Sequence, residues 1–206
     1  MIDRERPHQC SVYSADGELN GAISDIGRKL WTELAKVAPW LQDAIESGSP
    51  TEIEYCDRYL LSPLACRLLY EVLKTLSEKG DNVPSLQLLT MSTSSSGYPR
   101  FLFHNWSDSR EQESTLKALL GSISKPTIVM MDRFRLPHAR TMKIKWSNGM
   151  SASITFDQGM GFARLVGRIQ HSFGTSGAVQ AKSMLGMNFH IEQNSHKVPF
   201  YIMGGE

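Results

Sequence analysis

The fold is decided within residues 52–90, where the sequence reads EIEYCDRYLLSPLACRLLYEVLKTLSEKGDNVPSLQLLT. Its first six residues alternate between charged and apolar side chains, which predicts a strand with one buried face. Ser62 and Pro63 then provide a helix N-cap and a first helical residue, and apolar side chains recur at helical spacing after them. The closing LQLLT predicts a second strand. The stretch therefore predicts a β-α-β unit with a right-handed crossover.

Further elements are expected on both sides of this unit. Residues 127–131 are wholly apolar, which predicts a third strand in the centre of the sheet. Asn148 and Gly149 join two alternating runs, which is a strong hairpin signal, so we expect a β-hairpin near 140–156. The other expected elements are a polar lead-in over 1–22, a helix over 23–46 that breaks at Pro39, a connecting or ligand-binding loop over 92–97, a helix over 108–123, a loop with one short helix over 171–186, and closing strands at 189–191 and 199–203.

These elements indicate an α/β fold with a mixed sheet flanked by helices. The 206 residues allow one large domain, or one domain and a small appendage, at about 150 residues per domain. We expect a helical N-terminal extension over residues 1–50 and the main domain over residues 51–206.

Composition narrows the classes of protein. Cys10, Cys56 and Cys66 are too few and too scattered for a disulfide framework or a cysteine zinc site. The six histidines have no metal-ligand spacing, and the chain has no Walker motif or complete dinucleotide loop, so we expect neither metal nor cofactor. No apolar run is long enough for a membrane span, and the polar N-terminus is unlike a signal peptide. These features favour a cytoplasmic protein.

Charge is divided unevenly along the chain. Residues 1–132 carry 13 Lys and Arg against 18 Asp and Glu, whereas residues 133–206 carry 9 against 3. A basic half favours a phosphate-bearing partner or an acidic protein surface; alternatively, the two halves pack together and partly cancel. The candidate phosphate-binding residues are Arg133, Arg135, Arg140, Lys143 and Lys145, and Arg164 and Arg168 could extend their surface.

Side-chain parity predicts a polar cluster at one end of the sheet. In the strand at 140–146, Met142, Ile144 and Trp146 form an apolar inward face, and the two lysines lie on the other face. Extending the inward face backwards adds Arg140 and His138. Asp57 ends the first strand on its own inward side and is their candidate partner, because buried charges need one. The cluster is either an anion-binding pocket or a structural network that locks the sheet. We assign Asp57, Arg58 and Asp157 to a structural polar cluster.

An ordered series of short motifs resembles the phospholipase D-like domain found at the C-terminus of MIT-domain proteins. The resemblance covers about residues 52–165. The motifs that carry it are EIEYCDRYL (52–60), LQLLT (86–90), LPHARTMKI (136–144), SNG (147–149) and FDQGMGF (156–162). The family's His-Asp-Arg tripeptide reads His138-Ala139-Arg140 here. The resemblance implies a phospholipase D-like α/β fold.

True phospholipase D enzymes carry a His-x-Lys-x(4)-Asp motif, with a histidine nucleophile and a phosphate-binding lysine. Here Arg140 stands at the lysine place and Lys145 at the aspartate place, so the motif is lacking. Such enzymes pair two motif copies, and a homodimer of this chain could do so with His138 as the nucleophile.

Three functions are therefore open. The leading one is a non-catalytic phospholipase D-like module that binds a phosphate-rich partner, most simply DNA or RNA, as an accessory subunit of a larger complex. The resemblance also fits a bacterial antiviral defence system or, by the family's precedent, a phosphoinositide headgroup. The second is a dimeric nuclease or phosphodiesterase with His138 as nucleophile. The third is a structural adaptor that packs a methionine-rich surface on a larger protein partner.

Overall fold

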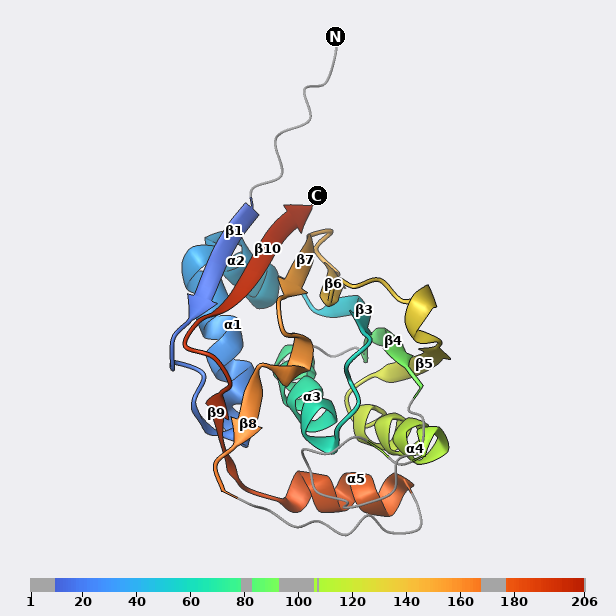
Figure 1. The fold of residues 1–206 in the computed structure, drawn as a ribbon. Coiled ribbons are helices and arrows are strands. Elements are labelled where there is room, and N and C mark those ends of the chain that lie inside the picture. The colour runs from blue at the N-terminus through green and yellow to red at the C-terminus, as the bar shows by residue number, and fades with distance from the viewer. Residues whose placement is uncertain (1–9, 79–82, 93–105, 107, 168–176, 206) are drawn as a thin grey trace.

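The computed structural model describes residues 10–78, 83–92, 106, 108–167 and 177–205. A mixed sheet of seven strands forms its centre (Figure 1). In their order across the sheet, the strands are β1 (Cys10–Ala15), β10 (Val198–Gly205), β7 (Ser151–Phe156), β6 (Thr141–Trp146), β3 (Pro50–Asp57), β4 (Ser85–Met91) and β5 (Lys125–Met131). Strands β3, β4 and β5 are parallel, and the remaining neighbours are antiparallel. This confirms the predicted α/β class with a mixed sheet.

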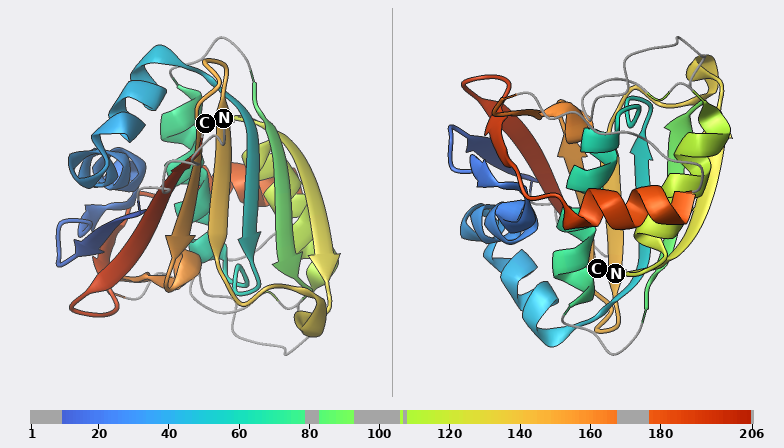
Figure 2. Two further views of the ribbon diagram at one scale, coloured as in Figure 1. Left: turned by 90° about the horizontal axis from the view of Figure 1, so that it is seen from above. Right: turned by 90° about the horizontal axis from the view of Figure 1, so that it is seen from below.

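Helices cover one face of the sheet, and among the described residues the opposite face carries none (Figure 2). The helices are α1 (Ile26–Val37), α2 (Pro39–Ser47), α3 (Pro63–Ser77), α4 (Ser109–Leu120) and α5 (Gly177–Gly186), with three short 3₁₀ turns, η1 (Ile23–Asp25), η2 (Arg133–Arg135) and η3 (Gly159–Gly161). A small second sheet has the order β2 (Gly21–Ala22), β9 (His190–Gln193) and β8 (Ala163–Leu165). None of these helices is long and apolar enough to cross a membrane.

The predicted β-α-β unit is β3-α3-β4. Ser62 caps α3 by accepting a hydrogen bond from the Ala65 backbone N–H at 3.2 Å, and Pro63 occupies the first turn. Nearly every side chain of α3 is buried, since the helix lies between the sheet and other helices. The hairpin is β6-β7, with Gly149 at φ +86° in its turn. Pro39 separates α1 from α2, as its fixed φ and missing N–H predict.

Two expectations about the edges of the sheet were wrong. The apolar strand β5 lies at an edge instead of the centre, with Ile128 and Val129 only half-buried on their opposite faces. An apolar run fits either place, because sheet order is set by tertiary packing. The supposed polar lead-in contains β1, the other edge strand, whose Tyr13 stacks on Phe200 with ring centres 5.7 Å apart.

The first 50 residues share one hydrophobic core with the rest of the chain. Leu30 and Leu34 of α1 belong to the same buried cluster as Tyr55 of β3 and Leu69 of α3. The predicted boundary at residue 50 falls at the beginning of β3. Because the core is shared, α1, α2 and β1 pack with the rest of the sheet and its helices. The predicted loop over 92–97 lies, apart from its first residue, outside the described residues.

Candidate functional site

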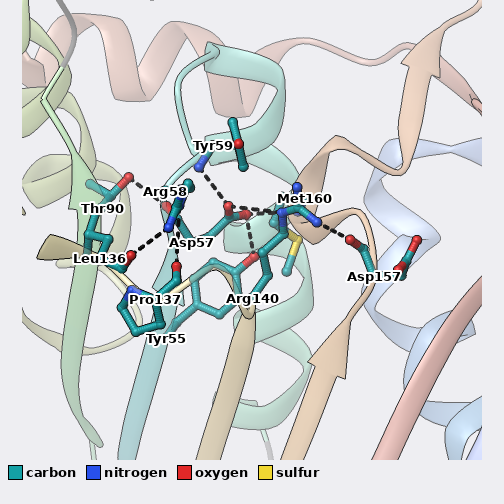
Figure 3. Close-up of polar contacts among 10 residues, drawn as sticks. All are labelled: Tyr55, Asp57, Arg58, Tyr59, Thr90, Leu136, Pro137, Arg140, Asp157 and Met160. Carbon is teal, nitrogen blue, oxygen red and sulfur yellow. Dashed lines mark hydrogen bonds and ion pairs between the residues drawn. The ribbon is translucent and has the colours of Figure 1, made fainter. Parts of the chain in front are cut away.

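Polar side chains gather where β3 ends, at the carboxyl edge of the parallel strands (Figure 3). Asp57, the last residue of β3, is completely buried. Its Oδ1 accepts a hydrogen bond from the Tyr59 backbone N–H at 2.8 Å. Its Oδ2 accepts from the Tyr55 hydroxyl at 2.9 Å and from the Met160 N–H at 3.2 Å. Arg140 adds a positive charge, with Nε 3.9 Å from Oδ1. Three hydrogen-bond donors and one positive charge thus surround the carboxylate.

Burial and these donors act on the pKa of Asp57 in opposite directions. Burial raises the pKa of the carboxyl and prevails, whereas the hydrogen bonds from Tyr59, Met160 and Tyr55 and the charge of Arg140 lower it. Burial also holds the pKa of the Tyr55 phenol well above its usual value, and the neighbouring carboxylate adds to this effect. Tyr55 therefore stays protonated and serves as a donor.

Gly159 allows the turn η3 to approach Asp57 closely. Its φ is +56°, in the left-handed region that favours glycine, and a Cβ there would collide with Oδ2 of Asp57. This approach brings the Met160 N–H within reach of the carboxylate. The glycine-rich segment after β7 thus has a structural reason to carry a glycine at this place.

We expect Gly159→Ala to lower the free energy of unfolding by about 2–4 kcal/mol, because it adds backbone strain and displaces the Met160 hydrogen bond. Gly161→Ala is the matched control in the same turn, since a Cβ there meets no atom within 4 Å. Chemical denaturation of both variants measures the difference. Equal losses in the two variants would contradict the packing argument.

Arg58 fixes the connection between β5 and β6. Its guanidinium group is buried, and it donates to the Leu136 carbonyl at 2.6 Å and to the Pro137 carbonyl at 3.3 Å. The chain after η2 is thereby fastened to the end of β3. On the neighbouring strand, the Thr90 hydroxyl donates to the Asp57 carbonyl at 2.9 Å and ties β4 to the same point.

The alternation of side chains predicted that Asp57, His138 and Arg140 lie together at this end of the sheet. Asp57 and Arg140 do form an ion pair, but His138 does not join them. The Arg140 guanidinium lies 4.7 Å from the centre of the Tyr59 ring and donates to the Asp157 carbonyl. His138 is exposed, so the expectation that it faces inward was wrong. The reason is that β6 begins only at Thr141, so His138 precedes the strand and does not follow its alternation of faces.

Asp157 contributes its backbone and not its carboxylate to this cluster. Its carbonyl accepts from Arg140, while its side chain is exposed. Its predicted place in a structural polar cluster therefore holds for the main chain alone. Asp57 and Arg58, in contrast, are both buried through their side chains.

The predicted basic stripe on β6 is neutralised by its neighbour. Lys143 lies 2.8 Å from Glu54, and Lys145 lies 2.7 Å from Glu52, both across the β6-β3 pairing. The acidic first half and the basic second half therefore cancel on this part of the sheet. Because these two lysines already have carboxylate partners, a phosphate would have to compete with those carboxylates for them.

The arginines of η2 differ from these lysines. Arg133, Phe134 and Arg135, the basic-aromatic segment, are all exposed, and Phe134 is 97% exposed. Within the described parts of the chain, neither arginine has an ion-pair partner. The segment follows β5, so it lies at the same carboxyl edge as the Asp57 cluster; η2 is the yellow turn next to β5 in Figure 1. Open α/β sheets bind ligands at this edge.

His138 lies exposed close to this edge. A histidine nucleophile needs an orienting partner, and His138 has no hydrogen-bond partner among the described residues. Those residues also contain no group of three or more His, Cys, Asp or Glu side chains that could hold a metal ion. Sequence reasoning missed the roles of Tyr55 and Gly159 and the exposure of Phe134. Tyr55 shares the parity of Asp57, and Phe134 stands between two arginines, so both carried a readable signal.

The chain is thus a small α/β domain with a basic, aromatic segment at the carboxyl edge of its parallel strands. Residues 9–205 match the family described as the C-terminal domain of the DEAD/DEAH box helicase YjiV, and the chain belongs to this family. It is therefore a helicase-associated domain by family. No curated protein matches the chain.

Proposed function

We propose that the domain is a non-catalytic nucleic-acid-binding module that serves a helicase as an accessory part. The observation that carries this proposal is the basic-aromatic segment, in which two exposed arginines stand without ion-pair partners among the described residues. Guanidinium groups are suited to phosphate, which they bind through two parallel hydrogen bonds. The family's printed description names a helicase, and this supports nucleic acid over other phosphate-bearing partners.

Arg58 supports the proposal by holding the segment in place. Since its guanidinium binds the Leu136 and Pro137 carbonyls, the chain that leaves η2 is anchored to the sheet. A segment anchored in this way loses little conformational freedom when it binds, and this favours affinity. The phospholipase D-like relationship and the antiviral setting stay predictions, and binding through η2 requires neither.

We expect the chain to bind labelled DNA and RNA with an affinity that falls as salt rises. Arg133→Gln combined with Arg135→Gln should weaken binding about tenfold, or about 1.4 kcal/mol, and reduce the log-log salt slope by about 1.5–2. Lys143→Gln combined with Lys145→Gln is the matched control, because it removes the same charge from residues that already have partners. Fluorescence anisotropy at two salt concentrations measures both.

Several outcomes would contradict the proposal. Equal losses in the two double variants would mean that net charge, not the segment, attracts the nucleic acid. No binding by the unaltered chain would favour the adaptor, which packs on a protein partner. A gel of the same samples tests the enzyme: cleavage that disappears in His138→Ala would favour a nuclease with His138 as its nucleophile.

A further inference from the structure

We propose that Phe134 stacks on an unpaired base, so that the domain selects single-stranded over double-stranded nucleic acid. This inference rests on the proposed function and adds the class of substrate to it. It starts from the exposure of the ring. Phe134 is 97% exposed, whereas the next most exposed large hydrophobic side chain among the described residues, Val179, is 60% exposed. A phenyl ring left almost wholly in water is available for a ligand.

The backbone holds the ring outward. Arg135 donates its N–H to the Asp132 carbonyl at 2.9 Å, which closes the turn of η2. Beyond the turn, the Arg58 guanidinium donates a hydrogen bond to the Leu136 carbonyl at 2.6 Å. The turn is therefore closed by its own hydrogen bond and fastened to Arg58 after it, and Phe134 lies at its middle with an arginine before and after it. An aromatic ring between two cations matches a nucleotide, which offers one flat base and flanking phosphates.

The same geometry separates single strands from duplexes. Every base has a flat face, so stacking on a protein aromatic ring tolerates any sequence. In a duplex these faces are already stacked on one another, and a protein ring reaches them only by first unstacking a base step. The arginines contact phosphates in either form. Phe134 should therefore add affinity for single strands alone, while Arg133 and Arg135 add affinity for both forms.

The surroundings of Phe134 favour a nucleic acid over a protein partner. Protein interfaces contain arginine beside aromatic anchors, but they surround the anchor with a well-packed, largely apolar centre. Here the neighbours on both sides are exposed arginines, Asp132 is exposed next to them, and the buried Leu136 turns away from solvent. Residues 132–136 thus expose charged side chains around the ring and no second apolar side chain.

The test compares Phe134→Ala, Phe134→Trp and the arginine double variant. The probes are a labelled 15-nucleotide oligothymidine and a mixed-sequence duplex of 15 base pairs, in fluorescence anisotropy. We expect Phe134→Ala to bind the single strand about tenfold more weakly and the duplex less than twofold more weakly, with an unchanged salt slope. Phe134→Trp should retain the single-strand affinity. The melting temperature should not change in either variant, since the side chain touches solvent.

The outcomes distinguish this inference from the proposed function. If Phe134→Ala leaves single-strand affinity unchanged while the arginine double variant weakens it, stacking is wrong and the proposed function stands. Equal losses on both probes would also overturn stacking on an unpaired base. If the unaltered chain binds neither these probes nor RNA of the same lengths, both proposals fail.

Discussion

Asp57→Ala is expected to lower the free energy of unfolding by about 3–5 kcal/mol. The substitution removes the acceptor of three hydrogen bonds, and it leaves the N–H groups of Tyr59 and Met160 and the hydroxyl of Tyr55 without a partner. Each buried donor left unsatisfied costs about 1–3 kcal/mol. The partly buried guanidinium of Arg140 also loses its counter-charge.

Urea denaturation measures this loss, and two further variants define its cause. Asp57→Asn keeps one acceptor oxygen and should lie between Asp57→Ala and the unaltered chain. Asp157→Ala removes an exposed carboxylate that belongs to the same cluster only through its backbone, so it should change stability by less than about 0.5 kcal/mol. A loss below about 1 kcal/mol in Asp57→Ala would show that the carboxylate does not hold the edge together.

The second large effect is expected at the buried ion pair of α3. Arg67 donates Nε to Glu71 at 2.7 Å and also binds the Met184 carbonyl of α5, and both side chains are buried. Burial raises the pKa of Glu71, and the charge of Arg67 opposes this shift. Glu71→Ala leaves a buried guanidinium without its counter-charge, so we expect a loss of about 3–5 kcal/mol.

A double variant tests whether the loss of stability comes from losing the ion pair or from leaving one buried charge without its partner. Arg67→Met combined with Glu71→Leu removes both charges and should recover most of the loss, because an apolar pair carries no desolvation cost. Glu78→Ala is the control on the same helix, since Glu78 forms an exposed pair with Lys74 at 3.4 Å and should cost less than about 0.5 kcal/mol. A double variant as unstable as Glu71→Ala would contradict the charge argument.

Much of the fold could be predicted because its signals are local. The N-cap at Ser62, the break at Pro39 and the turn at Gly149 each depend on a few neighbouring residues. The edge positions of β1 and β5 could not be predicted, because they depend on pairings between distant segments. Strand β1 pairs with β10, almost the whole chain away.

The same distinction applies to the site. Parity alone brought Asp57 and Arg140 together, because alternation along a strand is a local property. The prediction that His138 faces inward failed, since it depended on where β6 begins, and the strand begins only at Thr141. The ion pairs of the β6 lysines could not be predicted without knowing which strand lies beside β6. Glu52 and Glu54 alternate on the outward face of β3, but only the β3-β6 pairing makes them partners.

The place of β10 between β1 and β7 has a consequence for how the chain folds. Cys10 pairs with Met203, so this edge of the sheet joins two segments that lie far apart in the sequence. Pairings across such long sequence separations are slow to form, because the chain must close a large loop before any contact compensates for the lost entropy. On the ribosome, β1 has no neighbouring strand until residues 198–205 have left the exit tunnel. Its exposed backbone is then an unpaired strand edge, and such edges promote aggregation during synthesis.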